Sequence, residues 1–364
     1  MKLTIVVPTY NRSEMLGRAL RGLLNQTLPA KQYEIVIVDD GSTDSTPQVV
    51  AEIGAPEWRL RYFRQENRGP AAARNHGVRE ARGEIILFTG DDCIPDERLL
   101  EEHLRAHDAE GDIGVIGHVA WHPELKVTAF MMFLEEGVQF GFKRIEDPED
   151  VPYWAFYTSN CSLHRRWLEM AGGFDEDFKH AAWEDIELAY RLSQRGFRII
   201  YRPAALTYHL HAITLESYLQ RQRVAGRAVV TFWRKHPELK EQLGILHATH
   251  PTAVKQLYEA MLSHAFSLGI RDALRDPNLP PDDQLGALSA DPAMLSARLA
   301  WIREVMREDD PEKEELRILR EEMPSLRAEY DRVTSRRLYR WAETAARLGW
   351  RLLGPLRSLR EGKP

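Results

Sequence analysis

Residues 83–92 read GEIILFTGDD, and this stretch decides the fold. Its apolar run at 85–88 predicts a short strand that is buried on both sides. The strand runs into two adjacent acids, Asp91 and Asp92. Like charges repel, and the repulsion grows as water is excluded. Either water therefore covers both carboxylates, or a positive group lies beside them.

Similar strands precede this one along the chain. LTIVVPTY (3–10) and YEIVIVDDGSTDST (33–46) begin as apolar runs, and RLRYFRQE (59–66) alternates like a half-exposed strand. Helical spacing of apolar residues is found at 13–26, 46–53 and 69–81. Strands that alternate with helices predict an α/β fold whose mainly parallel sheet carries helices on both faces.

The later part of the chain is mixed and then helical. A strand is expected at 113–123, a strand and a helix at 158–178, and a helix followed by a strand at 181–203. From about residue 213 the pattern is helical to the end, interrupted by the loop-like RDPNLPPDDQ (275–284). We therefore expect a catalytic domain at 1–235 and a helical C-terminal region at 236–364.

Composition narrows the class of protein. The chain has 364 residues, a formal net charge of −6 and only two cysteines. This balance argues against nucleic acid as a partner, and the cysteine count argues against a disulfide framework. Neither a signal peptide nor an apolar run long enough to span a membrane is recognised, so a cytoplasmic location is expected.

The acidic motifs follow predicted strands. Asp39 and Asp40 leave one strand, and Asp91 and Asp92 leave another. Ligands of parallel sheets bind beyond the carboxyl ends of the strands, so we expect these four acids to share a crevice. Paired carboxylates suit Mg²⁺ or Mn²⁺, with substrate phosphates completing the site. The alternative is that they only cap helices and form turns.

Two further groups could belong to this crevice. WEDIELAYRL (183–192) places Glu184, Asp185 and Glu187 in the first turns of a predicted helix. Acids also favour helix N-termini, and Glu187 is spaced to pair with Arg191, so a purely structural role is the alternative. TYHLH (207–211) supplies His209, a residue type that commonly ligates metals.

These pieces, in this order, resemble the family 2 glycosyltransferases, which have the GT-A nucleotide-sugar-binding fold. The resemblance covers roughly residues 1–235 and rests on the following segments: VVPTYNR (6–12), VDDGSTD (38–44), ENRGPAAARNHGVREARGEIILFTGDDC (66–93), SNCSLHRRWLEMAGGFDED (159–177) and WEDIELAYRLSQRGFRIIYRPAALTYH (183–209).

The resemblance implies a role for each matching residue. It implies a nucleotide-sugar donor bound by Pro8, Thr9, Tyr10, Asn11, Asp39, Asp40, Arg74 and Asp91. It implies Mn²⁺ or Mg²⁺ held by Asp92, Asp91 and His209, with Asp185 as general base beside Glu184. It also implies transfer with inversion at the sugar's anomeric carbon.

The chain departs from the family pattern in two places. Thr89 stands where many members carry a further aspartate, so one carboxylate that could help to bind ribose or metal is missing. The Gln-x-x-Arg-Trp signature of the processive synthases is not found after the second acidic cluster. A soluble enzyme that adds single sugars is therefore favoured.

The C-terminal region raises the question of the acceptor. Residues 332–364 carry nine Lys and Arg against two Glu, and 336–360 interleaves arginines with Trp and Leu. Such a basic amphipathic helix could lie on the inner face of a membrane and favour a lipid-linked acceptor. It could equally pack on the catalytic domain or on a second subunit. Aromatic residues that could stack on an acceptor sugar, or could form core, are Trp121, Phe130, Phe133, Phe140, Phe142, Tyr153, Trp154 and Phe156.

The sequence thus predicts a metal-dependent glycosyltransferase that moves a sugar, most simply from a UDP-sugar, to a saccharide or lipid-linked acceptor in cell-surface glycan or glycolipid synthesis. One rival is a nucleotidyltransferase, although no glycine-rich phosphate loop follows the first strand. Another is a sugar-nucleotide-binding scaffold that has lost turnover.

Overall fold

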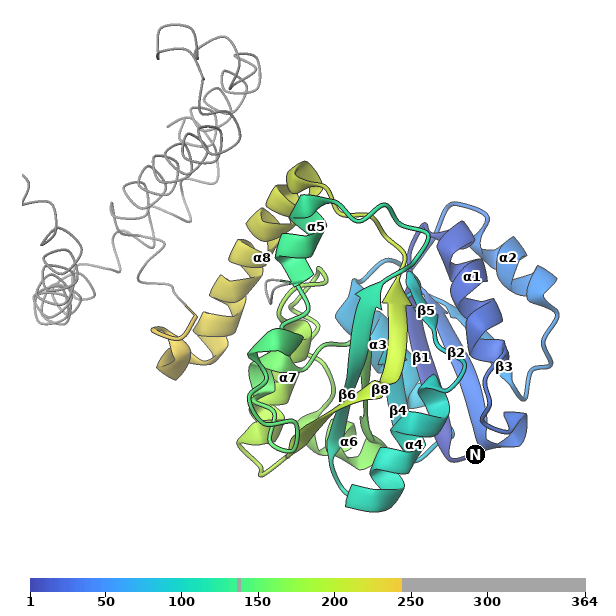
Figure 1. Cartoon of the computed structure of the whole chain (residues 1–364), viewed down its shortest axis with the longest axis horizontal. Coiled ribbons are helices and arrows are strands. Elements are labelled where there is room, and N and C mark those ends of the chain that lie inside the picture. The colour runs from blue at the N-terminus through green and yellow to red at the C-terminus, as the bar shows by residue number, and fades with distance from the viewer. Residues whose placement is uncertain (136–138, 244–364) are drawn as a thin grey trace, which may run out of the picture. The chain divides into compact units, whose positions relative to one another are not determined.

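The computed structural model describes residues 1–135 and 139–243. The chain divides into two units, Met1–Leu243 and Gly244–Pro364, and the description concerns the first (coloured in Figure 1). The predicted helical region beyond residue 243, with its basic stretch at 336–360, lies outside the described residues.

An eight-stranded sheet with the order β3-β2-β1-β4-β7-β6-β8-β5 forms the centre of the unit (Figure 1). Its strands are β1 (Leu3–Thr9), β2 (Tyr33–Asp39), β3 (Leu60–Arg64), β4 (Ile85–Thr89), β5 (Cys93–Pro95), β6 (Gly114–Trp121), β7 (Asn160–His164) and β8 (Ile199–His209). The pairs β1–β2, β1–β4, β2–β3 and β6–β8 are parallel, whereas β7 and β5 run antiparallel to their neighbours. The predicted mixed, mainly parallel sheet is confirmed.

Helices cover both faces of the sheet. The helices are α1 (Ser13–Leu24), α2 (Thr46–Ile53), α3 (Pro70–Glu80), α4 (Leu99–Glu110), α5 (Ala129–Phe133), α6 (Arg165–Ala171), α7 (Glu184–Ser193) and α8 (Leu215–Lys235). Short 3₁₀ turns lie at Ala30–Gln32, Phe142–Arg144, Tyr153–Ala155 and Pro237–Leu239. Because side chains alternate along a strand, Ile5 packs with α1 and α4 on one face, and Val6 packs with α3, α6 and α7 on the other.

The parallel register sets the position of the site. Thr9 at the end of β1 pairs with Asp39 at the end of β2, and β4 runs beside β1 in the same direction. The segments that follow these strands therefore leave the sheet at the same edge.

The last strand adds a histidine to that edge. The register between β6 and β8 shifts between Gly117 and His118, and His209 then lies opposite Cys93 of β5. The amide of Leu210 also donates to the carbonyl oxygen of Asp92 over 2.8 Å. Backbone pairing therefore fixes His209 beside the acidic turn, 117 residues further along the chain than Asp92.

A buried polar cluster links α4 to the sheet. Two histidine atoms, His103 Nδ1 and His107 Nε2, each lie 2.8 Å from Ser162 Oγ. The other ring nitrogen of His103, Nε2, lies 2.8 Å from Asn160 Oδ1. Burial lowers the pKa of His103 to about 4 and that of His107 to about 3. Both rings are neutral near pH 7 and act as packed hydrogen-bonding groups.

In the described part of the chain, no helix is both long and apolar enough to cross a membrane.

Candidate active site

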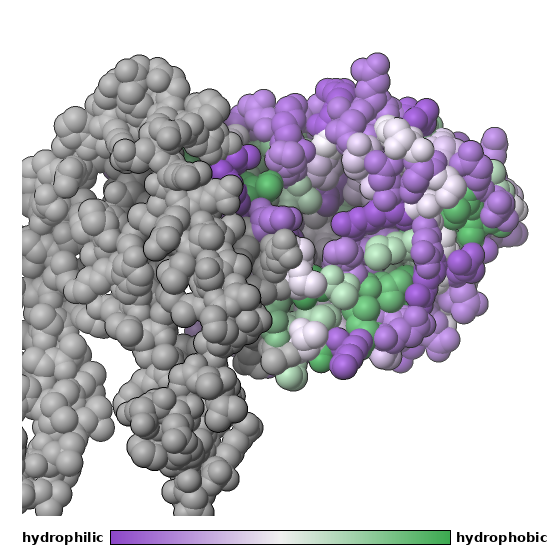
Figure 2. Space-filling model, turned by 90° about the horizontal axis from the view of Figure 1, so that it is seen from above, coloured by the Kyte–Doolittle hydropathy of each residue, from purple (hydrophilic) through white to green (hydrophobic). Residues whose placement is uncertain are grey.

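The strand ends bring the predicted acids together on one face of the domain. Thr9 Oγ1 donates to Asp91 Oδ2 over 2.8 Å, which ties the end of β1 to the turn after β4. Figure 2 views the domain from the side on which these strands end, and hydrophilic residues predominate there beside a smaller apolar patch. The predicted convergence of acidic segments at this edge is thus a feature of the fold.

Asp91 and Asp92 share one positive partner, Arg12. Its Nη1 atom lies 3.2 Å from Asp91 Oδ1 and 2.5 Å from Asp92 Oδ2. Burial, with the charge of Asp92 adding to it, raises the pKa of Asp91 to about 6. Burial alone would raise the pKa of Asp92 as well, but the charge that His209 carries when it is protonated and the charge of Arg12 outweigh burial and lower that pKa. Arg12 thus allows the two buried carboxylates to lie side by side.

The geometry of His209 fits a cation beside Asp92. Its Nδ1 lies 3.2 Å from the carbonyl oxygen of His211, which can only accept, so Nδ1 carries the proton. Burial lowers the pKa of His209, so the ring is neutral near pH 7. Its Nε2 lone pair then faces Asp92 Oδ2 at 3.6 Å. Two electron-rich atoms at this separation are stabilised when a cation binds them both.

The donor set suits a hard divalent cation that is completed by substrate. Among residues 1–135 and 139–243, no three His, Cys, Asp or Glu side chains converge closely enough to hold a metal by themselves. Mg²⁺ needs no such cage, because it is commonly bound by one or two carboxylates together with substrate phosphates. Asp91 and Asp92 fit that requirement, with His209 close by.

The turn that carries the two acids depends on Gly90. A Cβ atom at this position would lie 2.6 Å from Asp92 Oδ1 and 3.2 Å from Cys93 Sγ. The preceding Thr89, which stands where the family often has an aspartate, donates its hydroxyl to the carbonyl oxygen of Ser159 over 3.2 Å. Thr89 is therefore a structural residue, and the acidic pair stands without the additional carboxylate.

Asp39 and Asp40 are buried and organise the loops around them. Asp39 accepts from the Ser42 amide at 2.7 Å and from the Tyr62 hydroxyl at 2.5 Å. Asp40 accepts from Gln65 Nε2 and the Gly69 amide, both at 2.8 Å. A further bond comes to Asp40 from the Arg68 amide at 2.9 Å. These bonds shape the entrance to α3, and the predicted roles of both acids in donor binding stay predictions.

The segment after β1 combines an exposed ring with a constrained backbone. Tyr10 is 47% exposed, so its ring is open to a ligand, whereas Pro8 is half-buried. Asn11 has φ of 53°, the left-handed region, and its side-chain oxygen accepts from the Thr43 amide at 2.7 Å. This bond fixes the segment from which Arg12 reaches the acids.

The second acidic pair is held by a different arginine. Arg74 Nη1 of α3 lies 2.7 Å from Glu184 Oε1 of α7, and both side chains are buried. Burial, with the charge of Asp185 adding to it, raises the pKa of Glu184 to about 7 despite the opposing charge of Arg74. Among the described contacts, Arg74 Nε and Glu184 Oε2 have no hydrogen-bond partner.

Asp185 faces the same edge of the sheet as Asp91. Its Oδ2 accepts from both the amide and the hydroxyl of Thr158 at 3.3 Å. Thr158 precedes β7, whose first residue Asn160 pairs with Thr89 at the end of β4. Glu187, in contrast, accepts from Arg191 Nε at 2.8 Å, so the structural alternative holds for this residue.

A residue with a strained backbone, Trp183, directly precedes the second acidic pair, Glu184 and Asp185. Trp183 has φ of 71° and directly precedes α7, and its ring lies 6.1 Å from that of Phe232 in α8. A bulky residue in the left-handed region costs of order 1–3 kcal/mol and persists only where the surroundings impose it. The sequence did not identify Trp183, Arg12 and Thr158 as site residues. Arg12 and Thr158 contact residues that are distant in sequence, and the backbone angle of Trp183 cannot be inferred from the sequence.

The predicted acceptor aromatics divide into two groups. Trp121, Phe140 and Phe156 are buried core residues, so the core alternative is correct for them. The rings of Trp121 and Phe140 lie 5.6 and 6.0 Å from that of His209 and hold it in place. Half-buried rings remain at Phe130, Phe142, Tyr153 and Trp154. The side chain of Phe133 lies outside the described part.

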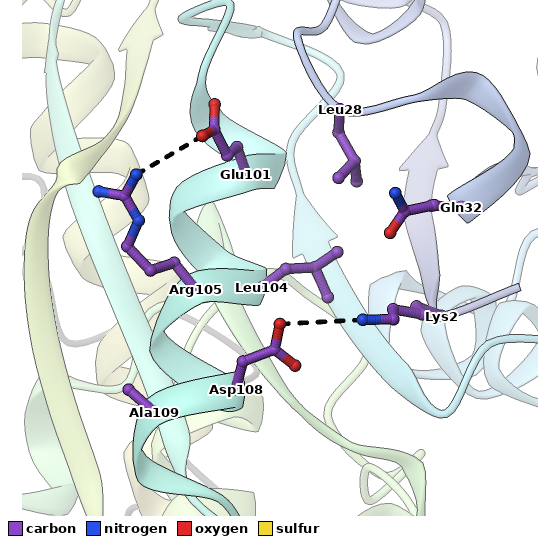
Figure 3. A pocket seen from close by; sticks show the side chains of 8 residues that line it. All are labelled: Lys2, Leu28, Gln32, Glu101, Leu104, Arg105, Asp108 and Ala109. Atoms are coloured by element: carbon purple, nitrogen blue, oxygen red, sulfur yellow. Dashed lines mark ion pairs between the residues drawn. The ribbon is translucent and has the colours of Figure 1, made fainter.

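A separate hollow of about 490 Å³ lies at the opposite edge of the sheet (Figure 3). It is lined by Lys2, Leu28, Gln32, Glu101, Leu104, Arg105, Asp108 and Ala109. Lys2 and Gln32 directly precede β1 and β2, so this is the amino-terminal edge. Its lysine and arginine are paired with acids at 3.8 and 3.5 Å. The hollow therefore belongs to a different surface from the acidic site.

Several known proteins are similar in sequence to this chain. The family model described as "Glycosyl transferase family 2" matches residues 4–169. The chain is 31% identical over 271 residues to validoxylamine A glucosyltransferase of Streptomyces hygroscopicus subsp. jinggangensis, a match that covers 66% of this chain and 62% of that protein. It is 26% identical over 258 residues to chondroitin synthase of Escherichia coli, covering 62% of this chain and 37% of the synthase.

Among solved structures, the fold is similar to that of the mannosyltransferase PcManGT from Pyrobaculum calidifontis in complex with GDP-Man and Mn²⁺. The TM-score is 0.54 at 23% identity, and the match covers 76% of this chain and 81% of that chain. The unit thus has the GT-A type of fold. The chain spans less than two thirds of the length of the glucosyltransferase and of the chondroitin synthase.

Proposed function

We propose that this protein is an inverting glycosyltransferase that moves a sugar from a nucleoside diphosphate sugar to an acceptor hydroxyl. The observation that carries the proposal is the placement of two acidic pairs, Asp91–Asp92 and Glu184–Asp185, at one edge of a sheet whose first part matches the family 2 model. One pair suits a cation and a diphosphate, and the other suits proton removal.

Donor binding is assigned to the loops after β1 and β2. The exposed ring of Tyr10 offers a face for the base, and Asp39 and Asp40 shape the loops around it. Arg74 is assigned to the donor site on the family resemblance, and its Nη1 atom also holds Glu184. A UDP-sugar is the favoured donor.

The cation site is assigned to Asp91, Asp92 and His209. A bound Mn²⁺ or Mg²⁺ supplies positive charge against the diphosphate leaving group. Asp91 and Asp92 would hold the cation at the end of β4, and His209, whose Nε2 lies 3.6 Å from Asp92 Oδ2, would be the third ligand. The buried aromatic rings around His209 keep water from one side of the site.

Asp185 is assigned as the general base. It takes the proton from the acceptor hydroxyl, whose oxygen forms the new bond to the anomeric carbon as the bond to the phosphate oxygen breaks. A positioned carboxylate contributes about 10²–10⁴-fold in such a step. Thr158 orients Asp185, and Glu184 acts as a positioning residue because Arg74 fixes it in the protein interior.

The acceptor is proposed to be a saccharide or a lipid-linked saccharide, in the synthesis of a cell-surface glycan or glycolipid in the cytoplasm or at the inner face of its membrane. The similar proteins include a glucosyltransferase and a chondroitin synthase, so they support sugar transfer but do not identify the sugar. Half-buried rings at Phe130 and Phe142 are the acceptor-stacking candidates in the described part.

The test is calorimetric titration of UDP and GDP into the protein with Mn²⁺ and then with EDTA, followed by transfer assays with the sugar nucleotides of the base that binds. Metal-dependent binding and slow donor hydrolysis support the proposal. Release of inorganic pyrophosphate from a nucleoside triphosphate would identify a nucleotidyltransferase instead. Tight binding without hydrolysis or transfer would identify a scaffold.

A further inference from the structure

We propose that Arg12 is an internal counter-ion that holds the acidic site in the absence of metal and has to leave it before a divalent cation binds. The inference rests on the proposed cation site and assigns to it a built-in competitor. The family resemblance implies no role for Arg12, and the contacts of its side chain alone point to this one.

The guanidinium contacts the oxygens that a cation needs. Arg12 Nη1 lies within hydrogen-bond distance of both Asp91 Oδ1 and Asp92 Oδ2, a bridge across two carboxylates. Asp91 Oδ2 is already taken by the Thr9 hydroxyl, and Asp92 Oδ1 faces Cys93 Sγ at 3.6 Å. The oxygens that Arg12 covers are therefore those left for metal, and both cations cannot occupy them together.

Arg12 can leave without moving the fold. Its side chain is 41% exposed, whereas the carboxylates that it bridges are 9% and 12% exposed. The backbone around it is fixed by the bond between Asn11 and the Thr43 amide and by that from the Ser13 amide to Asp44. The carbonyl oxygen of Arg12 also accepts from the Leu16 amide in α1 at 2.9 Å. Exchange of the two cations thus needs only a rotation of one long side chain toward solvent.

The charges show why an internal cation is useful. Without Arg12, the two carboxylates, 9% and 12% exposed, would lie side by side, and the Thr9 hydroxyl would be the remaining described hydrogen-bond donor to Asp91. Uncompensated buried charge is strongly unfavourable. Arg12 supplies the compensating positive charge when no metal is bound. In return, the apparent affinity for metal is the intrinsic affinity multiplied by the fraction of time that Arg12 is away.

The test measures Mn²⁺ binding directly by electron paramagnetic resonance on the full chain. Arg12→Gln removes the competitor, and Arg12→Met does so without supplying a new oxygen ligand. Arg18→Gln is the matched control, because Arg18 lies in α1, the helix that begins directly after Arg12, but pairs with Glu124 at the surface. We expect both Arg12 variants to bind Mn²⁺ about tenfold more tightly than wild type. This factor applies if Arg12 contacts the two carboxylates about nine tenths of the time, so that a cation can bind only in the remaining tenth.

Two further readouts accompany the affinity. In EDTA the Arg12 variants are expected to melt at a lower temperature than wild type, and saturating Mn²⁺ is expected to remove that difference. In wild type, Mg²⁺ is expected to move the Arg12 side-chain NMR resonance to that of a solvent-exposed arginine. This last measurement needs no variant and stands even if the substituted proteins fold poorly.

Unchanged or weaker Mn²⁺ binding in both Arg12 variants would overturn the proposal, as would an Arg12 resonance that saturating Mg²⁺ leaves in place. These outcomes are separate from the fate of the proposed function. If the wild-type protein transfers sugar in EDTA, no metal is needed. That result would contradict the exchange of Arg12 for metal but would agree with the proposed glycosyl transfer. Tighter Mn²⁺ binding by the variants, with no transfer from any donor, would do the reverse.

Discussion

Two acidic pairs lie at one edge of the same sheet, and each has an arginine partner. Arg12 bridges both carboxylates of its pair, whereas Arg74 contacts only Glu184 of the other. The two arginines also differ in depth. Arg12 over Asp91–Asp92 has 41% of its side chain exposed, whereas Arg74 against Glu184 has 10% exposed. The first arginine can be replaced by another cation from solvent, whereas the second is part of the protein interior. An arginine beside two acids can therefore be an exchangeable counter-ion, as proposed for Arg12, or a fixed structural partner, as for Arg74.

The strongest test of this contrast is Asp185→Asn. It removes the proposed base without removing a bridge, so the transfer rate is expected to fall by at least about a hundredfold. Donor and Mn²⁺ affinities are expected to stay within about twofold, because neither is assigned to Asp185. Steady-state kinetics and calorimetric titration measure the two. Equal loss of rate and of binding would show that Asp185 is structural.

The buried bridge is broken by Arg74→Met. Glu184 is then left in the interior without its partner, which is expected to cost about 3 kcal/mol in the free energy of unfolding measured with urea. The double variant Arg74→Met with Glu184→Gln should recover most of that loss. Recovery is absent if the cost comes from packing of Arg74 on Phe174 rather than from the unpaired charge.

The burial of Glu184 beside Asp185 predicts a pH dependence. The pKa of Glu184 is raised from 4.5 to about 7, so its stabilising contribution is present below pH 4.5 and is lost as the pH rises toward 7. The wild-type curve minus the Glu184→Gln curve should therefore fall across this window, by at most about 1.4 kcal/mol per pH unit. The opposite contribution of His103 and His107, whose pKa values are lowered, is common to both proteins and cancels in the difference. A flat difference would contradict the assignment.

The smallest effect is expected at Gly90→Ala, on the exchangeable pair. The new methyl group would lie 2.6 Å from Asp92 Oδ1, which a rotation of the carboxylate can relieve. We expect Mn²⁺ affinity to weaken several-fold while the free energy of unfolding changes by less than about 1 kcal/mol. Gly226→Ala in α8 is the control, because nothing lies within 4 Å of the methyl group that it adds. A large loss of stability without a change in metal binding would contradict the expectation.

The sequence predicts the sheet and the convergence of the acids because both follow from strand ends and apolar runs. Asp91 and Asp185 could be placed in this way, and so could His209 once its strand was recognised. The short β5 was missed, since three residues carry too little pattern. The two bridges were missed because they join Arg12 to residues 79 and 80 positions away, and Arg74 to one 110 positions away. A pairing of that range is decided by tertiary packing and leaves no local signal.

In the described part of the chain, Asn11 and Trp183 are the non-glycine residues with positive φ. Asn11 directly precedes Arg12, the partner of the first acidic pair, and Trp183 directly precedes the second pair. The left-handed backbone conformations of non-glycine residues therefore lie directly before residues of the candidate active site. Laboratory evolution for heat tolerance favours changes that relax such strain, and it commonly erodes activity where it does so. A more robust form of this protein is best sought by substitutions elsewhere, with residues 11 and 183 held constant throughout the selection.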